Sequence, residues 1–576
     1  MFLNRSLGGG AIQSDPIRRR SQHFGRIFPS KAQTKGNEDR YGIDHLPHVI
    51  RIANVNIPVG KDPGKEDVGL SSSLEKEIRR KLSLPRSYEF PAKSLEIVRK
   101  SFDARQTKKD PCFSYIVDLF LTDNVLQINI VERGKAVGDR GKDIGALINR
   151  RILSKDSNLC YGEGGAGTWS DGKLATNIGR NTDYVRFVFE RTMHCICFVT
   201  YYDDKLVEAG APSRILVDGK PHLGTDRLVR ILANFRQRLE ESGNVRFYFG
   251  KRVEEFLVED TAITGVVIED VDSGIKGKLH SDKDKIIVII TICIPNNNKG
   301  AELEQKEFAA GFRVEHPQSL INEVQYKAFA SMAGPKRTDK IPVSDYKLAS
   351  KDPPVYSFCM CPGGQIVPTS IVEDELCING MSFSRRQSQF ANAALVTTIP
   401  ITEFDGDGVL AGLEWQRNIE RKAAIAGGGK LVSPAQVLTD FLDDKFDSKV
   451  KELPKSSYRM GIRHFDVKTL YPPQVIERIR KSLLSFEKKL PGFISDNAVL
   501  HGVETRTSSA VRIKRSPESC SVSPFIHTLF AAGEGAGYAG GIVSAAVDGV
   551  KNQIMAKFVG KKKPPFYAMI EYMMIR

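Results

Sequence analysis

The chain has 576 residues, enough for two or three domains, and its hydrophobic share of 41% and charged share of 27% are those of an ordinary globular protein. No run of about 18 apolar residues occurs, so no transmembrane helix is predicted. The formal net charge is +15, but residues 1–45 carry +4 of it and residues 551–576 carry +5, which argues against the concentrated basic face of a nucleic-acid-binding protein.

Residues 1–45 form a basic leader. Residues 1–37 contain seven Lys or Arg and a single acid, Asp15, with no long apolar segment. This composition is typical of an organelle transit peptide, and a basic disordered terminus is the alternative. The nine cysteines show no paired CxxC spacing, which indicates free thiols in a reducing compartment and predicts no metal site.

Residues 46–123 are predicted to form a small α+β domain. The spacing of Leu74, Ile78 and Leu82 predicts a helix at 73–84. Alternating Val, Ile, Tyr and Phe predict three strands, at 48–57, 95–102 and 113–121.

A second segment, 124–300, is predicted to be the first part of a nucleotide-binding domain. Its expected elements are a strand at 125–131, a glycine-rich irregular stretch at 141–180, a helix at 225–242, a strand pair at 245–258 and 261–270, and a strand at 286–292. The remaining chain divides into a mixed α+β substrate or cap domain at 301–490, a return to the nucleotide-binding domain at 491–557, and an appended tail at 558–576.

Three motifs suggest nucleotide chemistry. The first is the strand that closes on Glu132 and Arg133, where a dinucleotide fold places the acid that bonds the adenosine ribose. An ordinary charged turn after a strand is the alternative.

The second motif is the glycine-rich run from Gly162 to Leu174. Glycines let backbone amides approach a phosphate or a flat ring, and hydroxyls add donors. A flexible surface loop is the alternative, although linkers seldom contain tryptophan. The candidate cofactor-binding residues here are Gly162, Gly164, Gly165, Gly167, Thr168, Ser170 and Asp171.

The third motif is an apolar strand at 529–532 that runs into a glycine turn and then a helix. A helix start of this kind directs free amides and the positive end of the dipole at an anion or a ring edge. A glycine-rich junction without a ligand is the alternative. The candidate cofactor-binding residues are Gly533, Glu534, Gly535, Gly537, Gly540, Gly541 and Ile542.

Seven ordered stretches carry a family resemblance: RGKDIGALINRRIL, NLCYGEGGAGTWSDGKLAT, DGKPHLGTDRL, YSFCMCPGGQIV, INGMSFSRR, LPGFISDNAVLHGVETRTSS and LFAAGEGAGYAGGIVSAAVDG. Together they resemble the FAD-dependent oxidoreductase (FAD-dependent dehydrogenase) family of plants and bacteria, over residues 48–120 and 128–557. The resemblance implies an α/β fold with a doubly wound, Rossmann-like FAD domain of the two-dinucleotide-binding kind, an N-terminal α+β domain and an inserted α+β substrate domain. It also implies FAD as cofactor, with NAD(P)H as an electron donor, a small-molecule substrate and a soluble protein of the plastid stroma.

The sequence departs from this family at the first phosphate loop. A dinucleotide fold needs a glycine turn about 20 residues before the ribose acid, but residues 70–133 contain no glycine. The first strand, its loop and its helix are therefore expected to be absent, which leaves the FAD domain incomplete and its sheet without a central strand. Loss of two or three bonds to the pyrophosphate, each about 1.5–3 kcal/mol, weakens FAD binding roughly a hundredfold to a millionfold. The segments 194–205 and 286–300 also interrupt the family pattern.

Candidate catalytic residues lie outside these motifs. Cys359 and Cys361 form a CxC in a glycine turn and are either a disulfide that exchanges electrons with flavin or packed core thiols. His222 is either a proton donor beside flavin or a structural residue before a helix. Arg506 either holds a carboxylate or flavin, or forms a buried Glu–Arg pair.

Three functions remain open from the sequence. The first is an FAD-dependent oxidoreductase that transfers hydride through flavin, and the second is a non-catalytic remnant that binds no FAD. The third is a flavin-linked protein that acts on RNA, because the N-terminal α+β domain is small and basic. The sequence names neither the substrate nor the oligomeric state.

Overall fold

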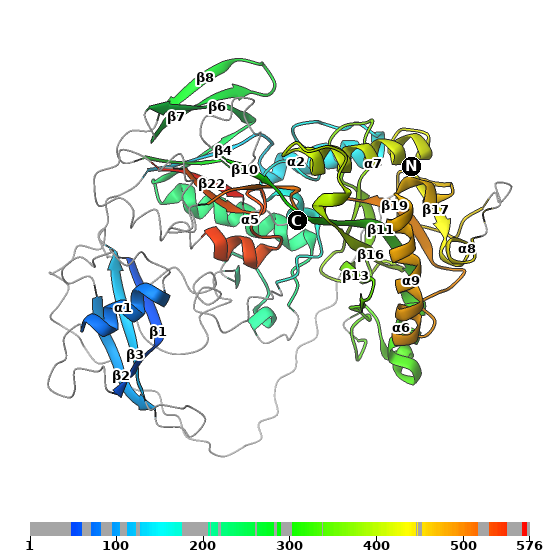
Figure 1. Cartoon of the computed structure of the whole chain (residues 1–576), viewed down its shortest axis with the longest axis horizontal. Coiled ribbons are helices and arrows are strands. Elements are labelled where there is room, and N and C mark those ends of the chain that lie inside the picture. The colour runs from blue at the N-terminus through cyan, green and yellow to red at the C-terminus, as the bar shows by residue number, and fades with distance from the viewer. Residues whose placement is uncertain are drawn as a thin grey trace, which may run out of the picture. The chain divides into compact units, whose positions relative to one another are not determined.

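The computed structural model describes residues 48–59, 71–81, 95–103, 112–121, 127–174, 206–207, 209–216, 221–259, 262–280, 285–289, 302–336, 338–444, 446, 452–515, 529–549 and 567–572 (Figure 1). The predictions for the leader at 1–45 and for the segment 194–205 lie outside these residues.

A three-stranded antiparallel sheet forms the N-terminal part, in the order β1-β3-β2. Its strands are β1 His48–Pro58, β2 Leu95–Asp103 and β3 Cys112–Leu121, and its helix is α1 Ser72–Lys81. Helix α1 buries Leu74 and Ile78, four residues apart on one face, as the periodicity predicts. The predicted strands and helix of this part are confirmed.

A five-stranded sheet, in which every pair of neighbours is parallel, has the order β21-β22-β9-β4-β5. Its strands are β4 Gln127–Glu132, β5 Val245–Phe249, β9 Lys285–Ile289, β21 Leu529–Gly533 and β22 Tyr567–Tyr572. Helices α2 Val137–Arg150 and α5 Thr225–Glu241 pack against each other beside it. Among the described residues, no element that precedes β4 in the chain joins this sheet.

Three sequence predictions for this region are wrong. Residues 141–150 were expected to be irregular but continue helix α2, whose glycines are accommodated because its other face is buried. The tail, expected to be an appendage, contributes β22 between β9 and β21, and β4 pairs directly with β9, so no empty place remains in the sheet. The predicted single strand at 245–258 is two strands, which separate at Gly250 with its φ of +66°.

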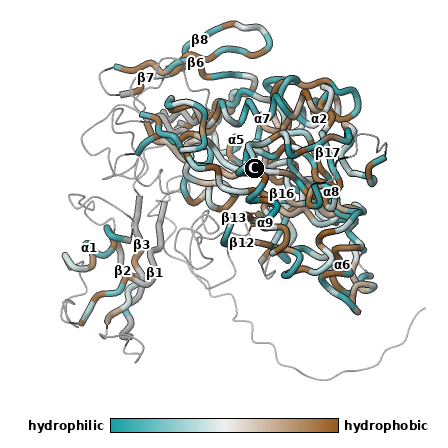
Figure 2. The backbone as a smooth tube through the Cα atoms, turned by 45° about the vertical axis from the view of Figure 1, so that its right-hand side comes forward, coloured by the Kyte–Doolittle hydropathy of each residue, from teal (hydrophilic) through white to brown (hydrophobic). Residues whose placement is uncertain are grey.

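A second antiparallel sheet follows β5, in the order β6-β7-β8. It consists of β6 Lys251–Glu259, β7 Ala262–Asp270 and β8 Lys276–His280. Strand β8 is hydrophilic and almost wholly exposed (Figure 2). The predicted pairing of 245–258 with 261–270 is thus confirmed for the β6–β7 part.

The largest sheet has seven strands in the order β12-β13-β16-β11-β19-β17-β18. Its strands are β11 Phe308–Pro317, β12 Ala349–Lys351, β13 Pro354–Cys361, β16 Phe390–Ile399, β17 Ser433–Val437, β18 Ile462–His464 and β19 Val499–Glu504. The accompanying helices are α6 Gln318–Tyr326, α7 Ala411–Gly427, α8 Leu438–Leu442 and α9 Pro473–Lys489. Two small ribbons complete this part, β10 Leu303–Gln305 with β20 Val511–Ile513, and β14 Gln365–Pro368 with β15 Ile378–Met381.

The main hydrophobic core lies between this sheet and its helices. Strand β11 is buried on both faces over nearly its whole length, because it runs through the centre of the sheet. Phe312 at the middle of β11 makes edge-on contacts with Phe441 and Tyr471 at ring distances of 5.8 and 5.1 Å. In the described part of the chain, none of the helices combines the length and apolarity that a bilayer crossing needs.

Candidate functional site

Glu132 ends β4 at the carboxyl edge of the parallel sheet, where ligands bind in open α/β folds. Its side chain is buried, at 1% exposure. Oε1 accepts hydrogen bonds from the backbone N–H of Gly134 at 2.7 Å and of Gly162 at 3.1 Å. The first motif is therefore joined directly to the second.

Arg133, the other residue of the first motif, points to a different partner. Its Nε donates to Asp156 Oδ1 at 3.0 Å, and its guanidinium lies 4.3 Å from the centre of the Tyr161 ring. Arg133 thus anchors the loop between α2 and the second motif.

The amino end of α2 is closed by a side chain of the same protein. Glu163 Oε2 accepts from the backbone N–H of Val137 at 2.7 Å, and Oε1 accepts from Arg236 Nε at 3.0 Å. Burial raises the pKa of Glu163, and these two donors offset part of that rise. A carboxylate is favourable at a helix start, so Glu163 satisfies a backbone donor there.

Arg140, on the inner face of α2, organises the second motif. It is fully buried, with 0% exposure. Its Nε donates to the carbonyl of Asn158 at 2.8 Å, and Nη1 donates to the carbonyl of Glu163 at 2.8 Å and to Thr168 Oγ1 at 3.3 Å. The guanidinium therefore donates hydrogen bonds to loop carbonyls that would receive them from backbone N–H groups in a helix or sheet.

The glycine-rich run is a tight, largely buried loop. Gly162 and Gly164 adopt φ values of +117° and +79°, which side chains rarely allow. A Cβ on Gly164 would lie 2.3 Å from both Leu232 Cδ1 and Thr168 Oγ1. The run continues through a 3₁₀ turn at Gly165–Trp169. Of the predicted residues, Gly162, Gly164, Gly165, Gly167, Thr168 and Asp171 are buried and Ser170 is half-buried.

The second motif ends in a buried ionic cluster around Asp171. Its carboxylate pairs with Arg386 Nη2 at 2.6 Å and Lys173 Nζ at 2.8 Å, and accepts from Ser382 Oγ. Burial by itself raises the pKa of Asp171, but the charges of Lys173 and Arg386 outweigh it and hold the pKa well below its usual range. Asp171 is therefore an anion already paired by the protein.

His222 joins this cluster through the backbone, because it forms an isolated antiparallel bridge with Lys173. Burial and then Arg386 lower the pKa of His222 to about 4, so the ring is neutral at pH 7. Its Nε2 is buried and has no hydrogen-bond partner among the described residues. The unpartnered nitrogen of a neutral imidazole is suited to accept a hydrogen bond or a proton.

The CxC lies on the other side of Lys173. Lys173 Nζ donates to the carbonyl of Met360, the residue between Cys359 and Cys361. Arg313, fully buried in β11, donates to the carbonyl of Cys359 from Nη1 and Nη2 at 3.3 and 3.4 Å. The structure thus brings together His222, the CxC and the end of the second motif.

The third motif has the predicted strand, turn and helix. Gly533, with a φ of +75°, ends β21, and its N–H donates to Asp548 Oδ2 at 2.8 Å. Asp548 also pairs with Arg515, whose guanidinium lies 3.4 Å from the centre of the Tyr538 ring. The helix spans 542–549, and its first internal bond is from Ala545 N–H to the Gly541 carbonyl at 2.8 Å. The N–H groups at 541–544 therefore point beyond the helix start.

The remaining residues of the third motif differ in exposure. Gly537 is buried with a φ of +89°, and Glu534 is 7% exposed. Gly535, Gly541 and Ile542 are half-buried, and Gly540 is exposed.

The third motif packs beside the other two. Ile542 contacts Val137 of α2 and Leu232 of α5, which also lies against Gly164. Val543 packs in one hydrophobic cluster with Leu174, the last residue of the second motif. All three motifs therefore converge around α2 and α5.

Comparison with known proteins places this arrangement in a family. A protein of Clostridium beijerinckii (strain ATCC 51743 / NCIMB 8052), described as an uncharacterized protein, is 30% identical over 572 residues, which cover 88% of this chain and 99% of the relative. The chain belongs to the same family as this clostridial protein. Residues 307–507 also match the family model described as FAD-dependent protein, C-terminal domain-like.

Solved flavoenzymes show a more distant similarity. The glycerol-3-phosphate dehydrogenase from Bacillus halodurans, complexed with FAD, is 11% identical with a TM-score of 0.21, and the match covers 64% of this chain and 65% of that one, less than two thirds of the dehydrogenase. A quinol-fumarate reductase is also 11% identical, with a TM-score of 0.26, covering 76% and 70%. Scores this low do not establish a common arrangement of the whole chain.

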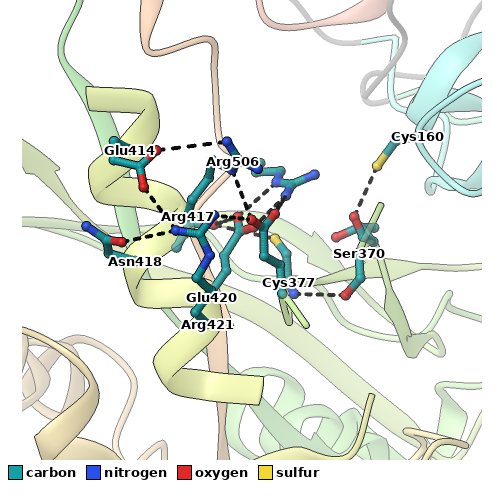
Figure 3. Close-up of polar contacts among 12 residues, drawn as sticks. Cys160, Ser370, Cys377, Glu414, Arg417, Asn418, Glu420, Arg421 and Arg506 are labelled. Carbon is teal, nitrogen blue, oxygen red and sulfur yellow. Dashed lines mark hydrogen bonds and ion pairs between the residues drawn. The ribbon is translucent and has the colours of Figure 1, made fainter. Parts of the chain in front are cut away.

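Within residues 307–507, the segment that matches this family model, Arg506 lies in a second ionic cluster (Figure 3). Its Nε and Nη2 donate to the two carboxylate oxygens of Glu420 on α7 at 2.8 and 2.5 Å, and Glu375 lies 3.5 Å away. Glu375 also pairs with Arg417 at 2.9 Å and Arg421 at 3.2 Å. Arg506 is thus held by two carboxylates of the protein and is apart from the CxC cluster.

Sequence reasoning missed several residues that shape these clusters. Arg140, Glu163, Lys173 and Arg386 were not among the candidate residues, and all four bond to residues more than 20 positions away. A buried arginine in a helix of otherwise exposed charge leaves no periodic signal. Only Lys173 carried a hint, because it closes the Asp-Gly-Lys end of the second motif.

Proposed function

We propose that this protein is an FAD-dependent oxidoreductase that acts on a small organic substrate. The observation that supports this most is the convergence of Glu132, the loop from Gly162 and the helix start at Gly541 at one side of a parallel sheet. The FAD-dependent C-terminal domain at 307–507 is consistent with it.

The third motif fits a flavin. A Cβ on Gly541 would contact only Ser544 Oγ, at 3.4 Å, so its backbone is open to a ligand on the other side. The N–H groups at 541–544 are donors for the electron-rich edge of a flavin ring. By contrast, the α2 start does not fit a pyrophosphate, because Glu163 already caps it and would repel an anion. We therefore expect FAD binding to rest mainly on the third motif and the glycine-rich loop.

FAD, when bound, would supply the hydride acceptor or donor at its ring. The residues of this chain would hold it in place: the amides at 541–544 would bond the ring edge, and the glycine loop would allow close approach. Glu132 and Arg133 would lie toward the adenosine end. His222 would hold or move the proton of the substrate, because its ring is neutral and its Nε2 is buried without a partner among the described residues.

The basic leader supports import into a plastid as part of the same proposal. A fusion of residues 1–45 to a fluorescent protein, expressed in leaf cells, should colocalise with chlorophyll. Diffuse cytosolic fluorescence would refute this part alone.

Visible absorption of the purified full chain tests the central claim. We expect a flavin spectrum, or its appearance after titration with FAD. The variant Gly541→Val should weaken FAD binding at least about tenfold, because its side chain blocks one or two donors worth about 1.5–3 kcal/mol each. The matched control is Gly138→Ala on α2, where a Cβ meets nothing within 4 Å.

The outcomes separate the competing functions. A folded protein that stays colourless and binds no added FAD would refute the proposal and favour the non-catalytic remnant. Equal FAD affinity in wild type and Gly541→Val would refute the role of the third motif. Retention on RNA at high salt, without flavin, would favour the RNA-acting alternative.

A further inference from the structure

We propose that Cys359 and Cys361 form a redox-active dithiol that reduces a disulfide-bearing substrate by thiol–disulfide exchange. The inference goes beyond the proposed flavin chemistry, because the exchange needs only the two thiols and a disulfide. It rests on the backbone between the cysteines, on two cations beside them and on their unequal exposure.

The backbone of β13 brings the two thiols together. In a regular strand, residues two apart lie about 6.6 Å from each other, at the upper limit for a disulfide. Here the pairing with β16 shifts register between Phe358 and Cys361, and Cys359 has a φ of +44°. The Cys361 thiol donates a hydrogen bond to the carbonyl oxygen of Cys359 at 3.3 Å. The local bend thus overcomes the separation that a flat strand would impose on a CxC.

Two cations hold this bend through its backbone. Lys173 binds the carbonyl of Met360, and Arg313 binds that of Cys359. Burial lowers the pKa of each cation, but its paired carboxylate, Asp171 for Lys173 and Glu504 for Arg313, and then the two cysteines outweigh burial and raise it. Each cation in turn favours a thiolate nearby. Such surroundings distinguish reactive cysteines from inert core thiols.

Unequal exposure assigns the two roles. Cys359 is half-buried, whereas Cys361 has 0% exposure. Cys359 is therefore the thiol that an external disulfide reaches, and Cys361 is the resolving thiol. The hydrogen bond with Cys359, followed by burial, raises the pKa of Cys361 well above its ordinary value.

Reaction of Cys359 reverses that effect. A mixed disulfide at Cys359 removes both the hydrogen bond and the charge of Cys359 that raise the pKa of Cys361. Burial still raises this pKa, and the charges of Lys173 and Arg313 still lower it. The second thiol is thus easier to ionise only after the first has reacted. This order suits a two-step exchange.

The steps balance without a further oxidant. The Cys359 thiolate attacks one sulfur of the substrate disulfide, forms a mixed disulfide and releases one thiolate. The Cys361 thiolate then attacks the Cys359 sulfur, closes the Cys359–Cys361 disulfide and releases the second thiolate. The two protons of the dithiol pass to the two leaving thiolates, so the substrate gains two electrons and two protons and the protein loses them.

Two other cysteines provide internal controls. Cys160 and Cys377 each lie beside a threonine: Cys160 Sγ donates to the Thr369 carbonyl at 3.2 Å, and Cys377 Sγ accepts from Thr505 Oγ1 at 3.6 Å. Burial raises the pKa of Cys160 to about 11 and also raises that of Cys377. Both are expected to stay reduced under conditions that oxidise the CxC.

The experiment equilibrates the reduced full chain in glutathione buffers of varied thiol-to-disulfide ratio, quenches with acid, alkylates free thiols and maps the peptides by mass. We expect the peptide with Cys359 and Cys361 to lose both alkylation sites together in one two-electron transition, while the Cys160 and Cys377 peptides remain alkylated. The variant C361S should accumulate glutathione on Cys359, and C359S should accumulate none on Cys361. The variant K173M should slow the first step about tenfold.

Several results would overturn the inference. These are independent alkylation of the two cysteines at every ratio, no mixed disulfide in C361S, or oxidation of Cys377 as readily as of the CxC. The wild-type chain carries the main readout, so a variant that fails to fold does not remove the test. Peptide mass does not depend on flavin, and a visible spectrum of the same samples reports separately whether the proposed cofactor is bound.

Discussion

Arg140→Met removes the guanidinium that supports the glycine-rich loop and keeps most of its volume. In the native protein Arg140 is fully buried and bonds to the carbonyls of Asn158 and Glu163, each at 2.8 Å. The surrounding packing is close, because a Cβ on Gly162 would lie 2.5 Å from Arg140 Cδ. Methionine fills the space but offers no donor, so both carbonyls stay buried without these bonds.

The expected loss follows from those two acceptors. The Asn158 carbonyl is left buried without this partner at a cost of about 1–3 kcal/mol, whereas the Glu163 carbonyl loses the Arg140 bond but still accepts from Thr168 Oγ1 at 3.2 Å. We expect the free energy of unfolding to fall by roughly 2–4 kcal/mol. If the loop binds FAD as proposed, the affinity of the variant for FAD should fall at least about tenfold as well.

Urea unfolding followed by circular dichroism and by tryptophan fluorescence measures the change, since Trp169 lies 5.9 Å from the guanidinium. Arg150→Met, at an exposed position of the same helix, is the matched control and should alter stability by less than about 0.5 kcal/mol. A loss below about 1 kcal/mol in Arg140→Met would show that water or a local shift satisfies the carbonyls, and the account of the loop would be refuted.

Two further predictions concern the C-terminal domain. Burial lowers the pKa of His316 to about 4, against about 6.5 in the unfolded chain. Between these two pH values the unfolded chain binds one more proton than the folded protein. The free energy of unfolding therefore falls by about 1.4 kcal/mol for each pH unit that the pH decreases. His316→Gln, which retains a donor for the Phe493 carbonyl, should flatten the pH dependence of urea unfolding by that slope, and an unchanged slope would contradict the assignment. Glu420→Gln should lower the free energy of unfolding by about 2–3 kcal/mol, because it leaves the buried charge of Arg506 without its main carboxylate partner. Glu477→Gln, at an exposed ion pair, is the control and should change the free energy of unfolding little. Equal effects of the two substitutions would refute the importance of the buried pair.

Local periodicity predicted the elements that stabilise themselves. Helix α5 repeats apolar residues at helical spacing, with Leu228, Ile231 and Leu232 buried, and the sequence locates it to within one residue. Strands β1, β2 and β3 follow from alternation, and β4 from a short apolar run. These elements carry their own signal because one face of each must be apolar wherever it packs.

Elements fixed by distant contacts could not be predicted. Helix α2 contains three glycines, which are poor helix formers, and it forms because Glu163 caps its start and Arg140 is buried on its inner face. Strand β22 pairs in parallel with β21 and β9, which precede it by more than 30 and more than 270 residues. Nothing in six residues of sequence indicates such partners, since strand pairing depends on the neighbour as much as on the strand.

The candidate site shows the same division. Glycine spacing marks the second and third motifs, and the acid that closes a strand marks the first, so all three candidates are visible in the sequence. The contact of Lys173 with the CxC spans 187 residues and has no local signature. Sequence therefore gives a list of candidates, and only the fold decides which of them form one cluster.

The pairing of the parallel sheet does not depend on the groups proposed to bind FAD. β4 pairs directly with β9, and β22 lies between β9 and β21, so among the described residues the parallel sheet forms without a strand that precedes β4. The α2 start, closed by Glu163, offers no substitute for a phosphate loop. Under the proposed function, FAD would therefore be held by the third motif and the glycine loop rather than by the α2 start. The thiol exchange proposed for Cys359 would not depend on how tightly FAD is held, because it needs only the two thiols and a disulfide.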